Sequence, residues 1–183
     1  MKLYIDCDGV LLNTIEVLYR VFDIFHEHEP TITMTDWLKI IDWSKVLHEA
    51  GALNDSVEVV KTFPIDKYNI STKTQHGERK VKYVFKPIDG LAILTTVQSS
   101  EEAFQKIKYI RELGVEHEII IVPARCDKNE VVSAKGNILV DDHKENLRKW
   151  QDAGGIAIQF HQEKKKGEFQ IINSLSQIHW LDQ

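Results

Sequence analysis

The 183-residue chain predicts an α/β protein with a mostly parallel sheet, helices on both faces of that sheet, and a small, mainly helical insertion. From Leu91 onwards, apolar strand-type runs alternate with helix-type segments at the spacing of βαβ units. An earlier strand-type run, Leu3 to Ile5, is separated from them by a helical stretch that is too long for a simple crossover. These observations favour a Rossmann-like core that is interrupted after its first strand.

The composition is that of a soluble globular protein, with 43% apolar and 28% charged residues. This length suits one full-sized core plus a small insertion. A net charge of -5 argues against a polynucleotide or an anionic membrane as the main partner. Cys7 and Cys126 give neither a disulfide framework nor a zinc spacing, and we expect Cys7 to be a packed thiol. Because the sequence shows neither a leader nor a membrane-spanning apolar run, we expect a cytoplasmic protein. We also expect a monomer or a small homo-oligomer.

The insertion is predicted to open with an amphipathic helix from Thr14 to about His28, stopped by Pro30. Further helical segments are expected in residues 31–63: one capped by Thr35 or Asp36 and running through Trp37 and Trp43, one from Val46 to Ala50, and one opened by Asp55 or Ser56. Two alternating stretches, Tyr68 to Thr72 and Lys80 to Phe85, predict a hairpin. Residues 1–13 and 88–183 then form the core, and residues 14–87 form a cap.

The core elements follow from period and capping signals. Ser99 and Glu102 form a capping box before a helix whose predicted apolar stripe is Phe104, Ile107, Ile110 and Leu113. The other predicted core elements are strands at Leu91–Leu94, Glu118–Val122, Asn137–Val140 and Ile156–Phe160, a helix carrying Leu147 and Trp150 that ends at Gly154, and a helical tail from Ile171 to Trp180.

Asp6 and Asp8 follow the first strand directly and precede Gly9. While the strand continues, side chains two positions apart project to the same face, so the two carboxylates lie together. A solvated turn is the simpler alternative, because Asp and Gly are common turn residues. Against that, two unpaired carboxylates beside a buried strand are costly, and hard oxygen ligands favour Mg²⁺.

Polar side chains also end two later strands, Thr95-Thr96 and Asp141-Asp142, and Lys128 precedes the second of these. Parallel strands bring their carboxyl ends to one edge of the sheet, so these groups can converge. Four carboxylates for a cation, a hydroxyl donor and an ammonium suit phosphoryl transfer. An aspartate can be the nucleophile of such a reaction.

With these motifs in order, the chain resembles the haloacid dehalogenase-like (HAD) phosphohydrolase superfamily. The run from Asp6 to Val10 resembles the first motif, Ile93-Leu94-Thr95 the second, Lys128 the third, and the run from Ile138 to Asp142 the fourth. The resemblance spans nearly the whole chain. Within the superfamily, the Asp-Lys before Ile-Leu-Val-Asp-Asp is most similar to the 5'-nucleotidase and deoxyribonucleotidase branch.

The resemblance implies a role for each acidic residue. Asp6 is the expected nucleophile and a magnesium ligand. Asp8 is expected to protonate the leaving oxygen and then to activate water, with its backbone carbonyl on the metal. Asp141 and Asp142 complete the metal shell directly or through water.

For the phosphate, the resemblance implies Thr95, Thr96 and Lys128 as side-chain donors and the region of Gly9 and Val10 as a source of backbone donors. The residues themselves leave rivals open. Ser71-Thr72 competes for the second motif, Lys135 competes with Lys128, and His143 is a metal-ligand alternative that we expect to be a surface residue.

We therefore expect a magnesium-dependent phosphomonoesterase whose substrate is a small phosphate ester, with a nucleoside monophosphate as the favoured candidate. Trp37, Trp43 and Tyr68 of the cap either stack a base or fill its core, and we favour packing. The alternative is a catalytically silent binding or regulatory protein on the same fold. A receiver domain fits less well, because here an acidic pair ends a late strand.

Overall fold

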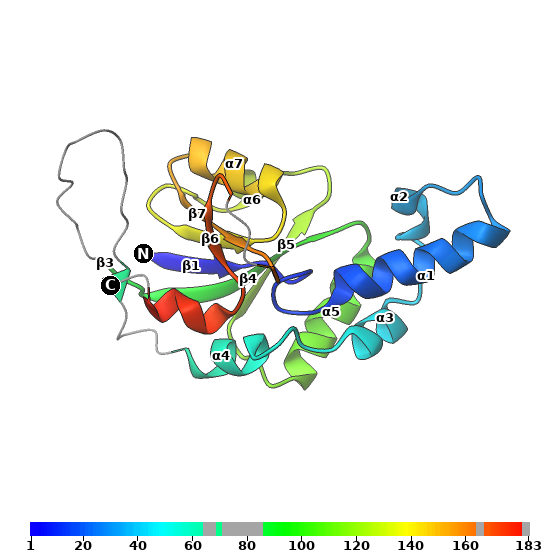
Figure 1. Ribbon diagram of the computed structural model, residues 1–183, viewed down its shortest axis with the longest axis horizontal. Helices are drawn as coiled ribbons and strands as arrows, with labels where there is room; N and C mark the ends of the chain where they lie inside the picture. The colour runs from blue at the N-terminus through cyan, green and yellow to red at the C-terminus, as the bar shows by residue number, and fades with distance from the viewer. Residues whose placement is uncertain (64–68, 71–85, 164–166, 181–183) are drawn as a thin grey trace.

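The computed structural model describes residues 1–63, 69–70, 86–163 and 167–180. Its centre is a six-stranded sheet of order β5-β4-β1-β6-β7-β8 in which every pairing is parallel. The strands are β1 Lys2–Ile5, β4 Gly90–Val97, β5 Glu118–Pro123, β6 Ile138–Asp141, β7 Ile156–Phe160 and β8 Gln170–Ile172. The predicted α/β sheet is confirmed and is parallel throughout (Figure 1).

Helices cover both faces of this sheet, as predicted. The described helices are α1 Thr14–His28, α2 Met34–Trp37, α3 Trp43–Ala50, α4 Ser56–Thr62, α5 Ser100–Glu112, α6 Lys128–Val131, α7 Lys144–Asp152 and a 3-10 helix Leu175–Trp180. Leu3 and Ile5 of β1 belong to the core shared with α4, α5 and the 3-10 helix. Tyr4, between them, faces the other way and meets the Trp150 ring of α7 edge-on at 5.3 Å. Alternating side chains of one strand thus serve both layers.

Helices α1 to α3 form a second small core at the carboxyl end of β1 (Figure 1). Its buried members are Val17, Leu18, Trp37, Trp43 and Val46. Helix α4 packs instead with the sheet. The division of the chain at residues 13 and 88 stays a prediction. The predicted hairpin strands lie largely outside the described residues, which include only an antiparallel pairing of β2 (Asn69–Ile70) with β3 (Lys86–Pro87).

Three details differ from the predicted elements. The helix expected from Thr35 or Asp36 through Trp43 is wrong, because α2 is capped by Thr33 and ends at Trp37. Asp42 accepts a hydrogen bond from the backbone N–H of Lys45 and so begins a separate helix, α3.

The tail is also not one helix. Its first residues form β8, which pairs with β7, and only Leu175–Trp180 is helical, as a 3-10 helix. Leu175 and Ile178 are both buried and lie three residues apart, a spacing that fits three residues per turn.

Only part of the predicted α5 stripe faces inward, namely Ile110 and Leu113. Phe104 and Ile107 are 60% and 38% exposed, whereas Ile110 is fully buried. The buried face instead includes two charged residues, Glu102 and Lys106, which form an ion pair one helical turn apart. Among the described residues, no helix has the length and apolarity to cross a membrane.

Candidate active site at the carboxyl edge of the sheet

The strand order brings the predicted motifs together. β1 lies between β4 and β6, so the residues after all three strands meet at one edge. The N–H of Asp6 donates to the Val140 carbonyl at 2.9 Å, which continues the β1–β6 ladder by one residue and sets Asp6 beside Asp141. Asp6, Thr95 and Asp141 are all buried at this edge.

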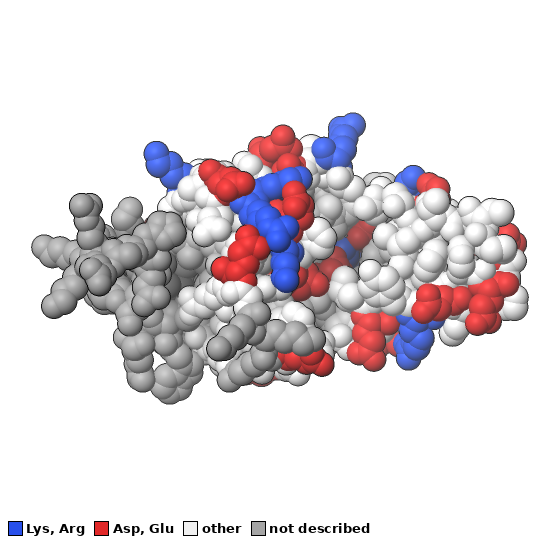
Figure 2. Space-filling model, turned by 45° about the horizontal axis from the view of Figure 1, so that its top comes forward, with Lys and Arg blue, Asp and Glu red and all other residues white. Residues whose placement is uncertain are grey.

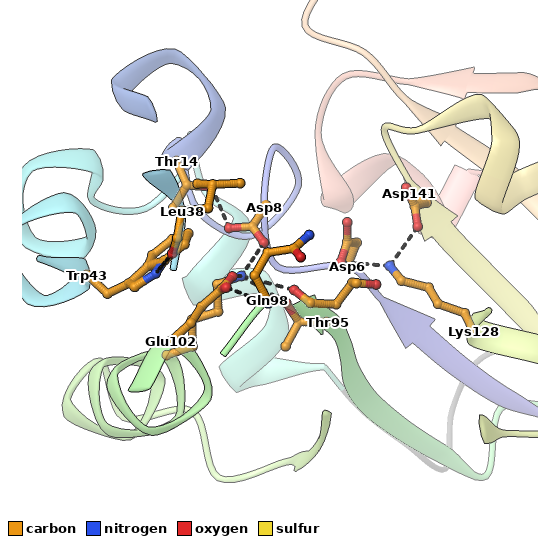
Figure 3. Close-up of polar contacts among 12 residues, drawn as sticks. Asp6, Asp8, Thr14, Leu38, Trp43, Thr95, Gln98, Glu102, Lys128 and Asp141 are labelled. Carbon is orange, nitrogen blue, oxygen red and sulfur yellow. Dashed lines mark hydrogen bonds and ion pairs between the residues drawn. The ribbon is translucent and has the colours of Figure 1, made fainter. Parts of the chain in front are cut away.

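Lys128 links the residue after β1 to the end of β6 (Figure 3). Its Nζ lies 2.7 Å from Asp6 Oδ1 and 2.7 Å from Asp141 Oδ2, and the side chain is 3% exposed. Lys128 is the first residue of α6 rather than a loop residue. The two carboxylates raise its pKa although burial acts the other way. The rival Lys135 is exposed and lies beside Gly154, away from these groups.

Asp6, Asp141 and Asp142 form an acidic cluster in which one oxygen from each lies within 4.8 Å of the others. Burial raises the pKa of Asp6 well above its usual range, against the opposing effect of Lys128. Burial and the nearby carboxylates raise the pKa of Asp142 to about 7. Both shifts express charge repulsion in a desolvated place, which a bound cation would relieve.

Asp141 is held in place by its own neighbours. The backbone N–H of His143 donates to Asp141 Oδ1 at 2.8 Å, and Asn146 Nδ2 donates to Oδ2 at 3.0 Å. The ring of His143 is at an exposed helix start, as expected, and is not in the acidic cluster.

Gly9 lies directly against this cluster. Its φ of +70° is in the left-handed region, and a Cβ there would sit 2.5 Å from Asp142 Oδ2. Only glycine avoids both the strain and the collision. The loop turns back through hydrogen bonds from the N–H groups of Leu11 and Leu12 to the Cys7 carbonyl. Cys7 is fully buried, and burial raises the pKa of its thiol well above the usual value, so it is a packed thiol.

The Asp8 side chain lies apart from the acidic cluster and has its own partners. Thr14 Oγ1 donates to Asp8 Oδ1 at 2.7 Å, and Lys106 Nζ lies 2.5 Å from Oδ2. Lys106 also contacts Glu102 Oε1 at 2.6 Å. In Figure 3, Asp8 points toward Thr14 and the α5 residues, while Asp6 points toward Lys128.

Lys106 and Glu102 are the residues that the sequence analysis missed. On the same helix, Lys108 and Glu112 have the same four-residue spacing and are exposed. Spacing alone therefore does not separate a buried pair from a solvated one. The only signal was position, because Glu102 and Lys106 lie on the first turns after the Thr95 strand end.

The two threonines of β4 differ. Thr95 is fully buried with its Oγ1 3.5 Å from Lys106 Nζ, whereas Thr96 is half-buried and its carbonyl accepts from Lys106 at 3.3 Å. The rival pair Ser71-Thr72 lies outside the described residues.

A hollow of about 570 Å³ opens beside Asp142. Its lining includes Gly9, Asn13 and Glu16 from the first loop and α1, and Phe160 and His161 at the end of β7. Figure 2 shows the surface hollowed between the part that holds the sheet and the part that holds α1 and α2. On this face, Figure 2 shows basic side chains of the described residues lying directly beside acidic ones.

No protein-family model and no curated protein matches this sequence. Solved structures match its fold. A hydrolase from Pseudomonas syringae superposes with a TM-score of 0.57 at 12% identity, over 100% of this chain and 98% of its own. A HAD-superfamily hydrolase of subfamily IA, variant 1, from Geobacter sulfurreducens gives 0.58 at 11% identity, over 97% and 96%.

The HAD-hydrolase YfnB from Bacillus subtilis, bound to magnesium, gives a TM-score of 0.54 at 11% identity, over 99% of this chain and 98% of its own. This chain has the HAD-like fold. At these identities the likeness concerns the fold, and what the site of this chain does has to be argued from its own residues.

Proposed function

We propose that the protein is a magnesium-dependent phosphomonoesterase that acts through an aspartyl-phosphate on Asp6. One observation carries the proposal: Lys128 bridges Asp6 and Asp141 beside Asp142, while the second aspartate, Asp8, is held separately. A buried carboxylate nucleophile beside a cation site suits phosphoryl transfer to an aspartate, and a second carboxyl two residues on can act as the acid and base.

The donor set fits Mg²⁺. Oxygen ligands from Asp6, Asp141 and Asp142 would hold the ion, together with the backbone carbonyl of Asp8 that the HAD resemblance implies. When bound, Mg²⁺ would supply positive charge for the phosphoryl oxygens beside the nucleophile.

In the first step, an Asp6 carboxylate oxygen attacks phosphorus and the bond from phosphorus to the ester oxygen breaks. Asp8 gives its proton to that leaving oxygen. In the second step, Asp8 takes a proton from water, and the water oxygen attacks the same phosphorus. The bond from phosphorus to Asp6 then breaks, which releases inorganic phosphate and restores both carboxyl groups.

The phosphoryl oxygens need donors while charge builds on them. Lys128 has one ammonium proton beyond those it gives to Asp6 and Asp141. Thr95, Thr96 and the backbone of Gly9 are the other donors that we assign to the phosphate.

For the substrate we propose a small phosphate ester, with a nucleoside monophosphate as the first candidate because of the nucleotidase-like motif around Asp141. Trp37 and Trp43 are 3% exposed in the core of α1 to α3, so neither offers a ring to a base. Tyr68 lies outside the described residues. A cytoplasmic monomer or small homo-oligomer stays our prediction.

The test is release of phosphate from an aryl phosphate and a panel of nucleoside monophosphates, with magnesium and with chelator. We expect magnesium-dependent turnover that falls at least about a thousandfold in Asp6→Asn, because the nucleophile is lost. Asp23→Asn, an exposed aspartate of α1, is the matched control and should keep the wild-type rate. Magnesium binding without turnover of any ester would favour the silent binding protein instead.

A further inference from the structure

Lys106 is a fully buried charged residue that has no place in the mechanism proposed above. Its side chain is fully buried on α5, and its ammonium lies 4.9 Å from the centre of the Trp43 ring of α3. Four oxygens surround that ammonium, from Asp8, Glu102, the Thr96 carbonyl and Thr95. Burying a lysine so completely is expensive unless its partners compensate, and the shortest of these contacts is to Asp8.

The two oxygens of Asp8 are fixed from two directions. Thr14, at the start of α1, donates to Oδ1, and Lys106 donates to Oδ2. A carboxyl group with one partner can swing about that contact, whereas two partners on different elements set the plane of the group. Lys106 can keep donating to Oδ2 when the other oxygen carries a proton, so the contact survives both states of Asp8.

Glu102 forms a second ion pair with the Lys106 ammonium. Its Oε1 lies 2.6 Å from the ammonium, and its Oε2 accepts from the backbone N–H of Gln98 at 2.7 Å. Glu102 is only 3% exposed, so this contact is hardly weakened by water. The first turn of α5 is thereby tied to the end of β4 and to Asp8 at once.

We propose that Lys106, anchored by Glu102, is a positioning residue that aims Asp8 at the leaving oxygen. This inference rests on the proposed phosphomonoesterase function and adds to it a role for the buried ion pair of Lys106 and Glu102, which no sequence motif indicated. The Lys106 ammonium is surrounded by oxygens of the protein and by the Trp43 ring, and its shortest contact is to Asp8, so we infer that it acts through Asp8 rather than on the phosphate. The two buried lysines have different partners: Lys128 forms ion pairs with Asp6 and Asp141, and Lys106 forms one with Asp8.

The experiment compares Lys106→Met and Glu102→Gln with Lys108→Met. Lys108 lies on the same helix, also faces a glutamate four residues away, and is exposed, so it is the matched control. For each variant, kcat and KM are measured on the best ester of the panel, and magnesium-dependent binding of inorganic phosphate is measured by calorimetry. Lys106→Met is also combined with Asp8→Asn.

We expect Lys106→Met to lower kcat by about a hundredfold or more, the scale of a lost acid–base contribution. KM and the Kd of phosphate should stay within about threefold, because Lys106→Met removes none of the residues that we assign to the phosphate and the contact of Lys106 with the Thr95 hydroxyl is the longest of the four. Glu102→Gln should lower kcat by roughly tenfold, the loss of one charged hydrogen bond, and Lys108→Met should do nothing. In the Asp8→Asn background, removal of Lys106 should have almost no further effect, because Lys106 acts only through Asp8.

Three results would overturn the inference: an unchanged kcat in Lys106→Met, a rise in phosphate Kd as large as the fall in kcat, or a full further loss in the Asp8→Asn background. If Lys106→Met fails to fold, Glu102→Gln decides by the same kcat and KM comparison. An inactive wild type would reject the proposed function and this inference together, whereas an active wild type with unaffected Lys106 and Glu102 variants would reject this inference alone.

Discussion

Gly9 is the residue at which backbone conformation and site chemistry meet. The turn after Asp8 needs a φ of +70°, and the space where a side chain would begin is already occupied by the Asp142 carboxylate. Two independent constraints therefore act on one position. They can be separated, because Gly51 has a φ of +63° and nothing within 4 Å of a Cβ.

We predict that Gly9→Ala and Gly51→Ala each lose about 1–3 kcal/mol of unfolding free energy from backbone strain. Only Gly9→Ala should also bind Mg²⁺ more weakly, by roughly 10–100-fold, because its methyl group would push Asp142 out of the acidic cluster. Urea unfolding and magnesium titration of both variants check this. Equal magnesium affinity in the two proteins would show that Asp142 does not depend on the open space at Gly9.

At the scale of elements, five of the six strands of the sheet were predicted from the sequence, whereas β8 and part of one helix face were not. Runs such as Leu91 to Leu94 and Ile138 to Val140 are apolar enough to be strands on any assignment. The α5 stripe was wrong at Phe104 and Ile107, because hydrophobic periodicity assigns lysine and glutamate to solvent, whereas Lys106 and Glu102 satisfy each other in the interior. For the same reason the sequence did not indicate Lys106 and Glu102 as site residues. Asp6 and Asp141 could be assigned from the ends of predicted strands, whereas Lys106 and Glu102 lie on a face of α5.

The burial of α5 makes a stability prediction. Ile110→Ala should lower the free energy of unfolding by about 2–5 kcal/mol, because it empties a fully buried volume. Phe104→Ala removes a larger side chain that is 60% exposed, and should change it by only about 0.5 kcal/mol. Denaturant unfolding of the two variants measures the difference, and a larger loss in Phe104→Ala would restore the face predicted from the sequence.

At the scale of the whole molecule, the parallel topology explains why the sequence alone could predict that motifs far apart in the chain lie at one edge of the sheet. β1 lies at the centre of the sheet between β4 and β6, so Asp6, Thr95 and Asp141 share one edge. The strand order does not predict which side chains surround Asp8 next to that edge. Asp8 leaves the acidic cluster for Thr14 and Lys106, and that separation depends on how α1 and α5 pack beside the loop rather than on strand order.

The same edge couples the metal to the stability of the entire chain. Asp6, Asp141 and Asp142 are crowded and desolvated in the folded protein and are free of one another when it unfolds, so Mg²⁺ should bind the folded state selectively. At a hundred times Kd, this is worth about 2.7 kcal/mol, which for a chain of this size raises the melting temperature by roughly 5–10 °C. Sodium chloride at matched ionic strength controls for screening, because it should not reproduce the shift.

Asp142→Asn should reduce the gain in melting temperature from magnesium while raising the metal-free melting temperature, since it removes one repelling charge from the cluster. Scanning calorimetry with chelator and with magnesium measures both effects, and an equal magnesium shift in the wild type and Asp142→Asn would place the ion elsewhere.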